Sequence, residues 1–166
     1  MTRSIYLGLG LMVVLTILQA TVFARFPVFE VPLQPALVAT LAWGLLRGPY
    51  EGLVWAFMGG ILLDVFSITP TGATALSLMA ATLLVIYVQQ VLPENPYLFP
   101  VLLTALGMTV YLLIYTGLLW VAQYGFNDRA LSLLPAVTLV HALLAIPIYW
   151  ALRYVDRLLY PRRIEA

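Results

Sequence analysis

A single acidic residue, Asp64, stands near the end of an otherwise apolar segment that begins at Glu51. A carboxylate at the centre of a membrane-spanning helix costs roughly 2.5–3.5 kcal/mol, and less toward the helix ends. An acid in such a segment therefore needs either a structural partner at the end of a helix or a role in a site.

Two interpretations of Asp64 follow from its surroundings. The turn from Ser67 to Gly72 contains Pro70, and these residue types supply the fixed and permissive dihedrals of a tight reversal. In the structural interpretation, Asp64 bonds the free backbone amides at the start of the next helix, where the helix dipole favours an anion. In the functional interpretation, it binds a partner or a translocated cation. We favour the structural role.

His141 lies near the middle of the last apolar segment and is the chain's one histidine. A proton relay would require other titratable groups at the same depth, and Thr109, Tyr111 and Tyr115 are the plausible neighbours. We therefore expect a neutral histidine that is hydrogen-bonded between helices. With no cysteine, no phosphate-binding loop and no nucleophile–base pair, we expect no enzyme, no cofactor and no metal site.

The composition places these residues in a membrane protein. The chain is 63% hydrophobic and 9% charged, with a mean hydropathy of +1.01, whereas soluble domains carry about 25% charged residues. The net charge of +1 argues against a nucleic-acid-binding surface. The sequence predicts an all-α bundle that forms one integral membrane domain over residues 1–166.

Proline, glycine and charged residues divide the chain into six candidate membrane spans, about 4–24, 35–46, 50–66, 72–92, 97–122 and 131–154. The first is too long for the core of a signal peptide, so we expect it to be retained. The second and third are short. They form either two shallow spans or one broken re-entrant pair, which would leave four true spans. We favour six spans, because non-helical backbone at membrane depth needs a special enclosed arrangement.

Arginine placement predicts the orientation of the spans. If both termini share one side, six arginines lie there (Arg3, Arg47, Arg153, Arg157, Arg162 and Arg163), against Arg25 and Arg129 on the other side. Both termini are thus expected in the cytoplasm. The carboxy-terminal arginines are more simply a topology anchor than a docking site. Interface belts are expected from the aromatic residues Trp43, Tyr50, Tyr97, Phe99, Trp120, Tyr124, Phe126, Tyr149, Trp150, Tyr154 and Tyr160.

Small residues recur every four positions at Gly52, Ala56 and Gly60, continuing the spacing of Gly44 and Gly48. Four residues turn a helix by about 400°, so these residues form a stripe along which another backbone can approach closely. The fourth span offers a matching stripe, consisting of Ala73, Ser77 and Ala81. The stripe serves packing inside the bundle or, in a sharper interpretation, an interface with another protein. We favour packing.

The segments 35–48, 59–64 and 70–76 together resemble the rod shape-determining protein MreD family. The shared features are a proline-led second span, an arginine–glycine turn, a Gly-Gly-Ile-Leu-Leu-Asp end at Asp64 and a Pro-x-Gly turn at Pro70–Gly72 before an Ala-Leu pair. Ala36 departs from the pattern, because many members carry an acid after the proline.

The resemblance implies a non-enzymatic scaffold of the rod complex in the bacterial cytoplasmic (inner) membrane, organising lateral peptidoglycan synthesis and cell shape. Its main partner would be the bitopic protein MreC, with the filament protein MreB, the polymerase RodA and its penicillin-binding transpeptidase as further members. The family is also similar in architecture to the six-helix substrate-binding subunits of energy-coupling-factor vitamin transporters, so capture of a small ligand is the alternative function. The expected structural motif or partner interface is Gly52, Ala56, Gly59, Gly60, Asp64, Pro70 and Gly72.

Overall fold

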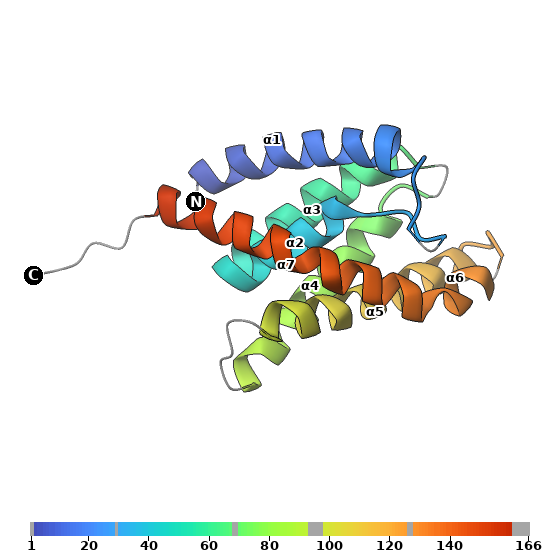
Figure 1. Ribbon diagram of the computed structural model, residues 1–166. Coiled ribbons are helices and arrows are strands. Elements are labelled where there is room, and N and C mark those ends of the chain that lie inside the picture. The colour runs from blue at the N-terminus through green and yellow to red at the C-terminus, as the bar shows by residue number, and fades with distance from the viewer. Residues whose placement is uncertain (1, 29, 68–69, 93–97, 126–127, 161–166) are drawn as a thin grey trace, which may run out of the picture.

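Helices make up almost all of the computed structural model, which describes residues 2–28, 30–67, 70–92, 98–125 and 128–160 (Figure 1). The expected all-helical fold is confirmed, and the described strand-like feature is one isolated bridge between Val28 and Val31. In chain order the helices are α1 (Thr2–Leu18), continued by the π-helical η1 (Gln19–Phe23), then α2 (Pro35–Arg47), α3 (Pro49–Val65), α4 (Ala73–Val91), α5 (Leu98–Val121), α6 (Asp128–Ser132) and α7 (Leu134–Leu159).

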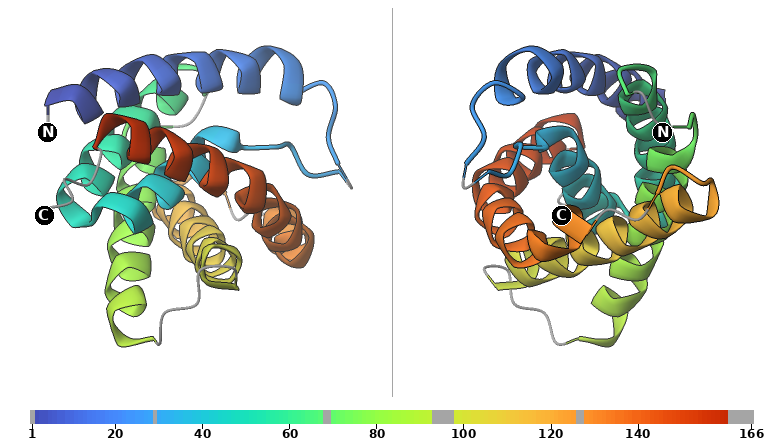
Figure 2. Two further views of the ribbon diagram at one scale, coloured as in Figure 1. Left: turned by 60° about the vertical axis from the view of Figure 1, so that its left-hand side comes forward. Right: turned by 90° about the vertical axis from the view of Figure 1, so that its right-hand side faces the viewer.

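The centre of the bundle is α2. Every residue from Pro35 to Leu45 is buried, and in the end-on view α2 lies inside a ring of other helices (Figure 2, right). One side of α2 contributes Leu37 and Leu41 to an apolar cluster with α3, α4 and α5. The other side contributes Ala36 and Trp43 to a second cluster, with α1, α3 and α7. A helix that is apolar on all sides is expected in such an enclosed position.

A single residue, Gly48, separates α2 from α3. Its φ of 84° and ψ of −172° lie in a region that glycine alone adopts without strain, so the chain reverses there without a loop. Pro49 then opens α3, where a missing N–H costs no helical hydrogen bond. The arginine–glycine–proline sequence therefore makes α2 and α3 a tightly joined antiparallel pair.

Four helices are long and apolar enough to cross a membrane: Ser4–Phe23, Ala73–Val91, Leu98–Val121 and Leu134–Leu159. The shorter α2 has 13 residues, or about 20 Å at 1.5 Å per residue, against about 30 Å of hydrocarbon. The structure thus shows a membrane protein with four candidate spans, and the six-span count stays a prediction. The last of these helices begins at Leu134, later than the sequence suggested, and continues to Leu159.

Candidate functional site

The Asp64 carboxylate closes the bend between α3 and α4. Its side chain is buried, with the residue 2% exposed. Oδ2 accepts hydrogen bonds from the backbone N–H groups of Gly72 at 2.7 Å and Ala75 at 3.4 Å, and Oδ1 accepts one from Thr74 at 3.1 Å. These are the hydrogen bonds that the structural interpretation of Asp64 predicts, because the first amides of a helix have no partner within it.

Local sequence explains why the carboxylate reaches this helix end. Gly72 has a φ of 100°, a left-handed conformation that turns the chain into α4 at its N-cap. Pro70 precedes it, and its carbonyl accepts a hydrogen bond from the Ala73 N–H at 3.1 Å. The bend therefore combines a proline with a fixed φ, a glycine that adopts a positive φ, and a buried carboxylate.

Gly60 allows α3 and α4 to approach closely just before this bend. A Cβ on Gly60 would overlap the Ala75 Cα and lie 2.7 Å from the Ala75 nitrogen, a separation that real Cβ atoms do not show. At the other end of the stripe, a Cβ on Gly52 would lie 2.7 Å from the Gly44 Cα of α2. The small residues thus permit backbone contacts that a side chain would block.

The stripe is therefore used within this chain. Gly52, Ala56, Gly59 and Gly60 are all buried, and a Cβ on Gly59 would face the Met12 sulfur of α1 at 3.0 Å. The partner of Gly60 is Ala75, so the expected pairing with a stripe of Ala73, Ser77 and Ala81 is only approximate in register.

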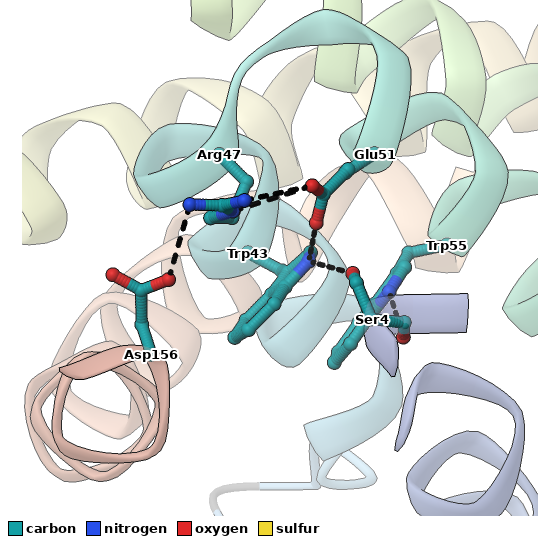
Figure 3. Close-up of polar contacts among 6 residues, drawn as sticks. All are labelled: Ser4, Trp43, Arg47, Glu51, Trp55 and Asp156. Atoms are coloured by element: carbon teal, nitrogen blue, oxygen red, sulfur yellow. Dashed lines mark hydrogen bonds and ion pairs between the residues drawn. The ribbon is translucent and has the colours of Figure 1, made fainter. Parts of the chain in front are cut away.

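A second polar cluster, which we call the Glu51 network, lies at the opposite end of α3 (Figure 3). Glu51 Oε1 accepts hydrogen bonds from Arg47 Nη2 at 3.0 Å and Nε at 3.3 Å. Glu51 Oε2 accepts one from Trp43 Nε1 at 3.2 Å, and the same indole N–H also lies 3.0 Å from Ser4 Oγ. Arg47 Nη1 faces Asp156 Oδ1 of α7 at 3.6 Å. The network thereby links α1, the α2–α3 turn and α7.

Two stacked indoles support this network. The rings of Trp43 and Trp55 lie 4.5 Å apart at an interplanar angle of 9°, and Trp55 Nε1 donates to the Ser4 carbonyl at 3.3 Å. Both are fully buried. The prediction that Trp43 belongs to a lipid-facing belt is therefore wrong, because its indole is enclosed and its N–H is satisfied by Ser4 and Glu51. By contrast, Tyr50 and Trp120 are exposed.

The contacts of the Glu51 network show which ends of the helices lie together. The start of α1, the turn at Arg47 and the last turns of α7 meet at one end of the bundle, on the left in Figure 1. The orientation of this end toward the cytoplasm, which the arginine count favours, stays a prediction. The sequence did not predict the network, because Ser4 and Asp156 are remote from Glu51 along the chain. The one local signal was the four-residue spacing of Arg47 and Glu51.

His141 holds the start of α2. Its Nε2 accepts a hydrogen bond from the Gln34 N–H at 3.0 Å, and its Nδ1 lies 2.7 Å from the Val137 carbonyl. An imidazole that accepts at Nε2 and donates at Nδ1 is the neutral form. The inter-helix partner is a backbone amide, whereas the expected neighbours were side chains of the fifth span. Thr109 of that span instead lies 3.0 Å from Thr138, oxygen to oxygen.

Replacing Glu51 by glutamine tests the Glu51 network. The amide keeps an acceptor for the Trp43 indole but removes the charge that Arg47 faces. Because Arg47 is partly exposed, we expect a loss of about 2 kcal/mol, below the 3–5 kcal/mol of a fully buried pair, and a melting temperature lower by roughly 4–8 °C. Tryptophan fluorescence during heating in detergent measures it. An Asp128→Asn control, at an exposed site in α6, should melt as the wild type, and equal melting of Glu51→Gln would contradict the prediction.

Comparison with known proteins identifies the family. The family model described as rod shape-determining protein MreD matches residues 1–156 of the 166-residue chain. The chain belongs to the MreD family. MreD proteins are structural membrane proteins that determine rod shape, and this family role is the one that the match supports for the chain.

No curated protein and no solved structure matches this MreD chain. The expected likeness to the substrate-binding subunits of energy-coupling-factor transporters therefore stays a prediction. The MreD match includes all seven residues expected to form the motif or interface, together with the Glu51 network up to Asp156.

Proposed function

We propose that this chain is a non-enzymatic scaffold of the rod complex in the bacterial cytoplasmic membrane. In this proposal it binds the single transmembrane helix of MreC and holds the periplasmic part of MreC near the wall synthase. MreB is reached through MreC, and RodA and its penicillin-binding transpeptidase belong to the same assembly. Both termini face the cytoplasm, so the Glu51 network lies at the inner leaflet and the Asp64 bend at the outer leaflet.

The observation that carries this proposal is the family match, which covers most of the chain. The partners of the acidic side chains support it. Among the described long helices the acids are Glu51, Asp64 and Asp156, and each faces a partner inside the chain. Carboxylates that bond the backbone at a helix end or pair with an arginine stabilise one conformation, and a scaffold requires such a fixed conformation. Capture of a small ligand by a transporter subunit gains no support from the comparisons.

The buried stripe changes how the motif serves this role. Gly52, Ala56 and Gly60 contact neighbouring helices of their own chain, so a partner helix has to bind another surface. We propose that the motif acts indirectly, by keeping the Asp64 bend and the α3–α4 packing in one conformation that MreC recognises.

Co-purification tests the partnership. Tagged MreC, extracted in mild detergent from native membranes, should retain this chain. The matched control is MreC whose transmembrane helix is replaced by an unrelated apolar helix of equal length, and recovery should fall about tenfold or more, equivalent to at least about 1.4 kcal/mol. Equal recovery with the exchanged helix would show that the proposed helix contact is wrong.

A further inference from the structure

The outward face of α7 changes character along its length. Leu143 and Ile146 are exposed, followed by Trp150 and Tyr154, and then by Arg157 in the last turn. These residues follow one another at three- or four-residue steps and so lie along one side of the helix. The apolar, aromatic and basic residues follow one another in the order expected for a helix that passes from the hydrocarbon through the interface to the headgroups of a membrane. Arg157 lies about 10 Å beyond Trp150 along the axis.

The arginines at this end of the bundle differ in whether they face a carboxylate. Arg47 is matched by Glu51 and Asp156 and also stacks on Tyr160, with its guanidinium carbon 3.8 Å from the ring centroid. Asp156 is therefore turned toward the interior of the bundle. Arg153 and Arg157 form no ion pair with the described acids, and the Arg153 guanidinium carbon lies 5.1 Å from the centroid of the Trp150 ring.

We propose that Arg153 and Arg157 bind the headgroup of an anionic phospholipid beside Trp150. Each arginine near an anionic membrane surface contributes about 1 kcal/mol, and a guanidinium can form two parallel hydrogen bonds to a phosphate. Trp150 and Tyr154 set the depth at which the helix meets the interface. The site requires insertion in a bilayer and is independent of MreC.

The position of Arg157 favours a lipid over an acidic protein segment. It continues a row of side chains that the bundle leaves uncovered, and the apolar part of that row requires hydrocarbon around it. The nearest negative charge that can meet the row from outside is thus a headgroup in the same leaflet. A zwitterionic headgroup carries its own cation, so two arginines that form no ion pair within the described part of the chain favour an anionic lipid such as phosphatidylglycerol.

Quenching of Trp150 fluorescence by brominated lipid tests this site. In a Trp120→Phe background, the remaining indoles apart from Trp150 are the enclosed Trp43 and Trp55. The purified chain is reconstituted in phosphatidylcholine bilayers that contain a fixed fraction of dibrominated phosphatidylglycerol or of dibrominated phosphatidylcholine. The brominated phosphatidylglycerol should be enriched beside Trp150 about fivefold for each arginine, which corresponds to about 1 kcal/mol each.

Matched variants decide the outcome. Arg153→Gln with Arg157→Gln should remove the preference, whereas Arg25→Gln, two residues beyond the end of η1, should retain it. Excess inorganic phosphate in the buffer should leave it unchanged, because the site takes the headgroup from the bilayer. Equal quenching by the two lipids, a preference that survives in the double variant, or its loss to free phosphate would each overturn the proposal. An acidic peptide that binds equally well in bilayers without phosphatidylglycerol would overturn it too.

Discussion

A Gly60→Ala variant is expected to lose about 3 kcal/mol of stability, although alanine is the better helix former. The added methyl group would overlap the Ala75 Cα and lie 2.7 Å from its nitrogen, so α3 and α4 must separate. Overpacking a close contact costs typically 1–3 kcal/mol and can cost more where the obstacle is backbone. The melting temperature in detergent, followed by tryptophan fluorescence, should fall by roughly 6–12 °C.

Two other helical glycines provide the control for this prediction. Gly10 and Gly117 have no neighbouring atom within 4 Å of an added Cβ, and alanine there gains up to about 1 kcal/mol of helix propensity. Gly10→Ala and Gly117→Ala should therefore melt at or above the wild-type temperature. If Gly60→Ala melted with them, the close approach of α3 and α4 would be refuted.

An Asp64→Leu variant should also be strongly destabilised, because three backbone N–H groups lose their acceptor. Thr74 and Ala75 are buried, and a buried donor left unpaired costs about 1–3 kcal/mol. We expect a total loss of about 4 kcal/mol, with the melting temperature lower by roughly 8–16 °C. Membrane-insertion scales give the opposite sign, since leucine is favoured over aspartate in hydrocarbon. The measurement therefore separates hydrogen bonding from hydropathy.

Asp64→Asn is the matched variant, because it keeps one oxygen acceptor and loses the charge. It should recover about half of the lost stability, since a charge at a helix N-terminus contributes about 0.3–1 kcal/mol in exposed settings and up to about 2 kcal/mol in partly buried ones. Retention of MreC should follow the same order, with Asp64→Leu weakest. An Asp64→Leu protein that melts normally and holds MreC as tightly as the wild type would contradict both the capping role and its part in assembly.

The features predicted from sequence are those whose causes are local. Pro35, Gly48 and Gly72 mark helix boundaries because a missing N–H or a positive φ is decided by the residue itself. Asp64 could be predicted to cap the next helix because Gly72 lies only eight positions further along the chain. The resemblance in residues 35–76 agrees with a family match to residues 1–156.

The features not predicted depend on residues that meet only after folding. Ser4 and Asp156 approach Glu51 because α1 and α7 pack at the same end of the bundle. Tryptophan is a residue type typical of the membrane interface, but Trp43 is enclosed because Trp55 stacks beside it. The registry of Gly60 with Ala75 is likewise a property of two packed helices, and a four-residue spacing alone cannot determine it.

The central position of α2 has a consequence for how the chain is made. A ribosome produces α2 before α4, α5 and α7, the helices that complete its enclosure. Before those helices are made, polar side chains of α2 can form hydrogen bonds with residues of α1, α2 and α3. Thr40 bonds the Ala36 carbonyl of its own helix, while Trp43 and Arg47 reach Ser4 and Glu51. Trp43 and Arg47 thus have side-chain partners before α7 is made, and Asp156 of α7 then adds a second carboxylate beside Arg47.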